Sequence, residues 1–221
     1  MVTRLEYEID HINLIDLADV FDRLSINQQV KIIQSLSPEK AGVIMGELEG
    51  RHQKRLADSA DTKTLGDIVS EMDADDSADF LGEVDQTQRK AILDEVAKED
   101  QAFSEDIKRL LSYDPETAGG VMTSEFLRCA KNQTVKEVGQ LIRDAGEDVE
   151  MIDYIYALDD QNHIEGVVSM RELWAAEPHA KMSDLMISDV VTVKTSEDQE
   201  EVSHIIEKYN FDAVPVVDDG N

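Results

Sequence analysis

The amino-acid sequence predicts an α + α/β fold, in which a superhelical repeat of short helices precedes two modules of order β-α-β-β-α, the second of them truncated. Three observations predict this fold. Apolar or small residues recur every twelve positions in the first half, strand-like segments alternate with capped helices from residue 126, and the same order restarts after residue 182. We expect boundaries at 1–115 for the helical region, 116–181 for the first module and 182–221 for the second.

The twelve-residue recurrence defines the helical region. It places an apolar or small residue at seven positions, namely Leu24, Leu36, Leu48, Ala60, Met72, Val84 and Val96. This period leaves room for about two turns of helix and a tight turn. Helices that short are stable only when they stack on one another. We therefore expect stacked helices from residue 15 to about 112, with 5–24 as a longer leading helix; an ordinary irregular helical domain is the alternative.

Capping residues mark where these helices begin. Ser37, Asp73 and Asp85 each follow an apolar residue and precede a polar first turn. Side-chain oxygens of Ser and Asp satisfy free backbone N–H groups at helix starts. Pro38 suits a first helical position, which needs no backbone donor.

The first module follows from strand and capping signals. Segments 126–130, 154–158 and 164–168 are rich in strand-forming residues, and the turn 159–162 makes the last two a hairpin. Thr134 and Glu137 have the spacing of a capping box and predict the start of a helix. A second helix is expected over 170–176, where Trp174 is expected to pack, with a dimer surface as the alternative.

The second module repeats this order only in part. We expect a strand over 190–194, a capping box formed by Ser196 and Gln199, a helix behind it and a strand over 213–217. The sequence ends at Asn221, before a return strand and closing helix.

The net charge of the chain limits the partners that it can bind. The 221 residues include 49 Asp and Glu against 21 Lys and Arg, a net charge of −28. Such a surface repels phosphate, so we expect no nucleic-acid partner and no direct binding to anionic lipid.

The sequence shows no membrane-spanning or secretory segment. Every window of 18 residues contains charge, and residues 1–10 have no signal-peptide core. Cys129, the only cysteine, excludes an internal disulfide, favours a reducing cytoplasmic setting and is expected to be packed.

One acidic segment is a candidate cation site. Asp75, Asp79 and Glu83 have the spacing i, i+4, i+8 and share a helical face, with Asp76 beside them. Mg²⁺ takes oxygen ligands, keeps several waters and often uses only one or two carboxylates. A solvated helix face is the alternative. A second acidic stretch, 144–170, contains no Lys or Arg.

Residues 114–123, Asp-Pro-Glu-Thr-Ala-Gly-Gly-Val-Met-Thr, join the two halves, and 181–186 lead into the second module. The helical repeat, this junction and the paired modules resemble the cytosolic part of the MgtE family of magnesium channels and transporters, with CBS modules in the second half. The resemblance covers nearly the whole chain. It implies a Mg²⁺-sensing regulatory region at the cytoplasmic face of the cell membrane, a homodimer through the CBS modules, and a membrane pore domain in full-length relatives. We expect this chain to lack that pore domain and not to conduct ions itself.

The resemblance also implies site residues. Asp75 and Asp79 match the acids that face the CBS region, and Asp218 matches an acid on the CBS side, with Asp76, Glu83 and Asp219 as neighbours. Low Mg²⁺ would let the acidic faces repel, high Mg²⁺ would close them, and the hinge would lie over 112–123.

CBS pairs often bind adenine nucleotides, and here Ser169, Arg171 and Glu172 stand at the matching positions, with Glu in place of the usual Asp. A soluble sensor of ATP or AMP that regulates a partner protein is therefore the alternative function. The sequence has no phosphate-binding glycine loop and no nucleophile or base beside its carboxylates, so an enzyme is not expected.

Overall fold

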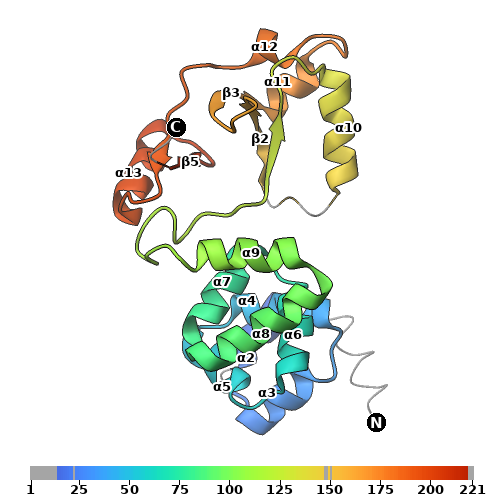
Figure 1. Ribbon diagram of the computed structural model, residues 1–221, viewed down its shortest axis with the longest axis vertical. Helices are drawn as coiled ribbons and strands as arrows, with labels where there is room; N and C mark the ends of the chain where they lie inside the picture. The colour runs from blue at the N-terminus through green and yellow to red at the C-terminus, as the bar shows by residue number, and fades with distance from the viewer. Residues whose placement is uncertain (1–13, 22, 147–148, 150, 219–221) are drawn as a thin grey trace. The chain divides into compact units, whose positions relative to one another are not determined.

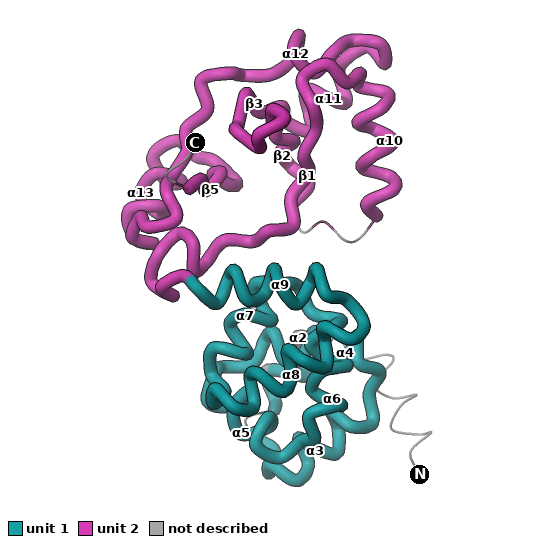
Figure 2. The backbone as a smooth tube through the Cα atoms, in the orientation of Figure 1, with its two compact units in different colours: residues 1–112 teal, residues 113–221 magenta. Residues whose placement is uncertain are grey.

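The computed structural model describes residues 14–21, 23–146, 149 and 151–218. The chain forms two compact units, Met1–Ser112 and Tyr113–Asn221 (Figure 2). Within the described ranges, no helix combines the length and the apolar character needed to cross a bilayer.

The first unit is helical, as predicted (Figure 1). Its described helices are α2 (Leu14–Phe21), α3 (Ile26–Ile33), α4 (Pro38–Glu47), α5 (Gly50–Ala57), α6 (Thr62–Val69), α7 (Ala74–Glu83), α8 (Gln86–Glu99) and α9 (Gln101–Leu110). Contacts run between alternate helices: α2, α4, α6 and α8 form one stack, and α3, α5, α7 and α9 form the other. The structural repeat is therefore a pair of helices, or twice the twelve-residue period.

Buried polar side chains join successive helices of this repeat. The Gln29 side-chain amide donates to the Phe21 carbonyl at 2.6 Å, and the Gln53 amide donates to the Met45 carbonyl at 2.8 Å. The Ser77 hydroxyl donates to the Val69 carbonyl at 3.3 Å. Carbonyls in the last turn of a helix lack intrahelical partners. These three residues, 24 apart in the sequence, each supply a donor eight residues downstream of its acceptor.

The predicted helix starts are confirmed for α4, α7 and α8. The Ser37 hydroxyl accepts from the Lys40 N–H, and Asp85 accepts from two N–H groups of α8. Asp73 precedes α7 without a side-chain cap bond. The twelve-residue period ends at α8, which runs for 14 residues and passes through the buried Val96. Of the expected leading helix 5–24, the described part is α2; residues 1–13 lie outside the described ranges.

The first module contains β1 (Phe126–Cys129), α10 (Val135–Ala145), β2 (Met151–Leu158), β3 (Ile164–Ser169) and α11 (Met170–Ala175). The sheet order is β1-β2-β3, with β1 and β2 parallel and β2 and β3 antiparallel. The capping box of Thr134 and Glu137 is confirmed. Cys129 lies in the apolar core, as predicted, and burial raises the pKa of its thiol to about 11.

The second module contains α12 (Met182–Leu185), β4 (Val193–Lys194), α13 (Gln199–Tyr209) and β5 (Val216–Val217), with β4 and β5 parallel. The predicted strands, 190–194 and 213–217, are each longer than the strands observed, β4 and β5. The predicted capping box at Ser196 is wrong, because Asp198 caps α13 by accepting from the Glu200 N–H at 2.8 Å. The carbonyls of Thr195 and Glu197 instead accept from residues of the junction, so the helix begins later.

Candidate metal centre

Helix α7 presents all four predicted acids of the first unit. Its apolar and small residues, Ala74, Ser77, Ala78, Phe80 and Leu81, are buried against the stack. This packing leaves Asp76, Asp79 and Glu83 exposed and Asp75 half-buried on the remaining surface. The expected shared face is therefore present on a helix that the stack holds in place.

Asp75 and Asp79 lie in an environment that opposes their own negative charge. Burial raises the pKa of Asp75, and repulsion from Asp73 adds to it. Partial desolvation raises the pKa of Asp79, followed by repulsion from Asp75 and Glu83. Within the described part of the chain, neither carboxylate forms an ion pair with a Lys or Arg. Oδ1 of Asp75 is also buried with no hydrogen-bond partner there.

Asp76 and Glu83 differ, because they pack against glycines of the neighbouring elements. A Cβ on Gly46 would lie 2.5 Å from Oδ2 of Asp76, and a Cβ on Gly50 would lie 2.5 Å from Cδ of Glu83. Gly50 is the first residue of α5. The Glu83 carboxylate therefore lies at a helix N-terminus, where the helix dipole favours negative charge. These glycines were not found from the sequence, because the contacts join different helices.

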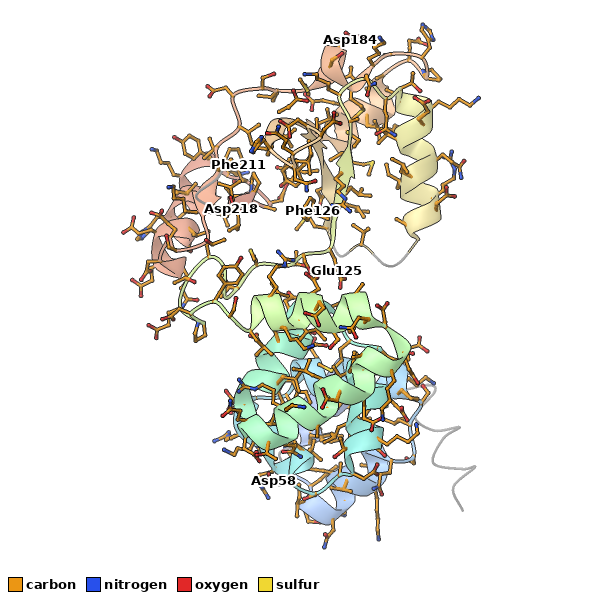
Figure 3. The ribbon with its side chains drawn as sticks, viewed as in Figure 1. Asp58, Glu125, Phe126, Asp184, Phe211 and Asp218 are labelled. Atoms are coloured by element: carbon orange, nitrogen blue, oxygen red, sulfur yellow. The ribbon has the colours of Figure 1, made fainter. Side chains whose placement is uncertain are left out.

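The remaining predicted ligands belong to the second unit. Asp218 is exposed on the segment after β5 (Figure 3). Asp219 lies outside the described residues. Among the residues that the structure describes, no three His, Cys, Asp or Glu side chains are grouped closely enough to hold a metal ion. The α7 acids thus form an acidic surface, and they do not by themselves make a coordination site among the residues described.

The acidic stretch 144–170 is partly engaged in local structure. Asp159 accepts from the N–H groups of Gln161 and His163 and contacts Nδ1 of His163 at 3.0 Å. These interactions, the His163 N–H first among them, lower the pKa of Asp159. Glu165 forms an ion pair with Lys131. Glu147, Asp148 and Glu150 lie outside the described residues.

The predicted nucleotide residues surround the start of α11. Oε2 of Glu172 accepts from the backbone N–H and the hydroxyl of Ser169, at 2.9 and 2.8 Å. The Ser169 hydroxyl accepts from the Glu172 N–H at 3.2 Å. Arg171 is exposed. Ser169 and Glu172 thus form a capping box, which occupies one oxygen of the carboxylate.

Family models match both halves of the chain. The MgtE intracellular N domain matches residues 12–116, and the CBS domain matches 118–173 and 182–221. The magnesium transporter MgtE of Thermus thermophilus is 31% identical over 223 residues, covering 96% of this chain and 47% of the relative. The MgtE of Bacillus subtilis is 29% identical over 213 residues with the same coverage. The chain therefore spans about half the length of these curated relatives.

Solved structures agree with the family models. The soluble part of a magnesium transporter superposes with a TM-score of 0.85 at 29% identity, covering 94% of this chain and 80% of that one. The cytosolic domain of the Mg²⁺ channel MgtE, in complex with ATP, has a TM-score of 0.82 at 30% identity, covering 97% and 86%. The chain belongs to the MgtE family, of which it contains the intracellular N domain and the CBS region.

Proposed function

We propose that this chain is a Mg²⁺-sensing regulatory region of a magnesium transporter, located at the cytoplasmic face of the cell membrane. In the full-length protein it would act on a membrane pore domain. It senses an ion and is not an enzyme. The names of its relatives support the transporter, and the net charge of −28 supports a role for cations.

The observation that carries the proposal is the environment of the Asp75 and Asp79 carboxylates on α7. Two neighbouring carboxylates with raised pKa values and no cationic partner in the described part of the chain are stabilised when a cation approaches them. Hydrated Mg²⁺ can neutralise such a surface through one or two carboxylates. Asp76 and Glu83, which are packed against glycines, add negative potential but are less free to reorient.

The proposed mechanism is electrostatic closure. Without Mg²⁺, the α7 acids repel the acids at the end of the second unit, Asp218 and its sequence neighbour Asp219. With Mg²⁺, the ions neutralise both surfaces and the two units close together. A ligand shifts such an equilibrium only by its differential affinity for the two states. Ions that bind between the units bind the closed state better, and in the full-length protein closure would restrain the pore.

Small-angle scattering across a Mg²⁺ titration tests the proposal. NaCl at matched ionic strength controls for general screening. We expect Mg²⁺ to reduce the radius of gyration of the wild type, NaCl not to, and Asp75→Asn/Asp79→Asn to respond less. Asp58→Asn/Glu99→Gln is the matched control, because it removes two exposed acids of the same unit that are each sixteen residues from the nearer end of α7 in the sequence. Equal effects of NaCl and Mg²⁺ would refute Mg²⁺ sensing.

We also propose a homodimer formed through the CBS modules. Trp174 was expected to pack within the module, and that expectation is wrong: its side chain on α11 is 88% exposed. Ile187 is also exposed, at 53%. Contiguous exposed apolar surface marks sites of association, and we propose that Trp174 and Ile187 contribute to such a surface for a second copy of the chain.

Adenine-nucleotide sensing is the second candidate function. One observation favours it: a relative's cytosolic domain was solved in complex with ATP. Here the exposed Arg171 would contact phosphate, and Ser169 and Glu172 would meet the ribose through the oxygens that the capping box leaves available. Calorimetry with ATP and AMP, on the wild type and Arg171→Ala, tests this function, and the absence of binding heat in the wild type would exclude it.

A further inference from the structure

We propose that residues 114–120, here called the junction clasp, are a fixed part of the second module, and that pivoting between the two units is confined to the backbone around Tyr113. The clasp precedes the first module in the sequence, yet its contacts are with the second. Mg²⁺ sensing, the proposed function, would explain what drives the units together. The contacts of the clasp do not depend on that proposal.

Backbone hydrogen bonds hold the clasp along the start of α13. The Ala118 N–H donates to the Glu197 carbonyl at 2.7 Å, and the Gly119 N–H donates to the Thr195 carbonyl at 2.9 Å. In the opposite direction, the N–H of Gln199 donates to the carbonyl of Glu116 at 3.0 Å. Together these bonds pair the clasp with residues 195–199 in an antiparallel sense.

Apolar packing supports the same contact. Ala118 is only 1% exposed and shares a buried core with Val193 and Val202. Four partly buried residues pack against that core: Ile205, Ile206, Val214 and Val216. All of them except Ala118 belong to the second module. Because the core is small, loss of one fully buried member weakens it appreciably.

The clasp is also rigid internally. The Asp114 carbonyl accepts from the N–H and the hydroxyl of Thr117, at 3.0 and 2.8 Å. A Cβ on Gly120 would lie 2.2 Å from the Asp114 carbonyl oxygen, and one on Gly119 would lie 2.6 Å from the Tyr113 ring. Real Cβ atoms do not approach other atoms this closely. The Gly-Gly pair is therefore required by close approach.

On the other side of Tyr113 the chain is tied to the helical unit. The Ser112 N–H and hydroxyl both donate to the Arg109 carbonyl of α9, at 3.1 and 2.6 Å. Within the described ranges Tyr113 makes no backbone hydrogen bond. The predicted hinge over 112–123 is thereby narrowed to Tyr113. Because the clasp is bonded to the second module, a movement of the helical unit acts directly on that module and only through it on the first. The predicted boundary at 116 stays a prediction; the clasp would assign 116–120 to the second module.

Amide hydrogen exchange on the whole chain, without Mg²⁺, tests the inference, because exchange reports local opening. We expect the amides of Ala118 and Gly119 to exchange as slowly as those of Val193 and Val202, and the Tyr113 amide to exchange at the rate of an unprotected amide. Exchange of Ala118 and Gly119 as fast as Tyr113 would overturn the clasp.

A pair of variants sharpens the test. Gly120→Ala should remove protection at Ala118 and Gly119 and reduce it at Val193, while leaving Val168 of the first module unchanged. The control is Gly139→Ala on α10, where a Cβ has room, with its nearest neighbour at 3.7 Å. If Gly120→Ala leaves Ala118 and Gly119 protected, the inference fails. A failed Mg²⁺ response with intact protection would refute the sensor alone.

Discussion

The Gln53 side chain tests how the helical stacks are held together. It is 5% exposed, and its amide donates at 2.8 Å to the Met45 carbonyl of α4. Gln53→Met keeps the length of the side chain and removes the donor. Leaving a buried carbonyl without a partner costs about 1–3 kcal/mol. Because the Leu48 N–H also donates to this carbonyl, at 3.3 Å, we expect the lower half of that range.

The assay is chemical denaturation of the helical unit followed by circular dichroism. A loss of about 1–2 kcal/mol in the free energy of unfolding is the expected result for Gln53→Met. Gln86→Met, at an exposed position of α8, is the control and should stay within about 0.5 kcal/mol of the wild type. If both variants are equally stable, the side-chain hydrogen bonds to carbonyls eight residues earlier do not stabilise the stacks. Apolar packing alone would then hold the helices together.

Three further predictions concern the acids and the exposed tryptophan. Gly50→Ala should stabilise the helical unit by less than the roughly 1 kcal/mol expected for replacing a helical glycine, because its Cβ meets the Glu83 side chain at 2.5 Å, and Glu83→Ala in the same chain should recover the difference measured by thermal melting. Because Asp75 and Asp79 have raised pKa values in the folded state, their contribution to stability is present below the ordinary aspartate pKa of 3.8 and is lost as pH rises through the raised values. Asp75→Asn/Asp79→Asn should therefore be more stable than the wild type at neutral pH without Mg²⁺, and the advantage should shrink on acidification; an advantage independent of pH would contradict this cause. Trp174→Ala should shift the chain toward monomer in sedimentation equilibrium, and an unchanged distribution would remove Trp174 from the dimer surface.

Much of the helical unit could be predicted because its signals are local. Ser37 and Asp85 cap helices through hydrogen bonds to residues two or three positions away, and such bonds depend little on the rest of the fold. The period of apolar residues also reflects a repeated packing position. It fails at α8, where the chain extends one helix through Val96 instead of turning.

The second module was predicted less well because distant residues decide its local structure. Ser196 and Gln199 have the spacing of a capping box, yet Asp198 is the cap. The neighbouring carbonyls at 195 and 197 accept from Ala118 and Gly119, which are nearly eighty residues earlier in the sequence. A pattern within a short window cannot register this competition, so tertiary hydrogen bonds override the capping preference.

The stacked helices place the acids of α7 in two different environments. Spacing alone grouped Asp75, Asp79 and Glu83, but the stack sets Glu83 against Gly50 at the start of α5, where backbone N–H groups favour its charge. Burial raises the pKa of both Asp75 and Asp79, and repulsion from neighbouring acids adds to it; at Asp75 the backbone N–H groups of Asp75 and Asp76 offset this only in part. A carboxylate already stabilised by the protein gains less from a cation than one that is not. The response to Mg²⁺ should therefore depend on Asp75 and Asp79, whose charged forms burial disfavours, more than on the total negative charge of the helix.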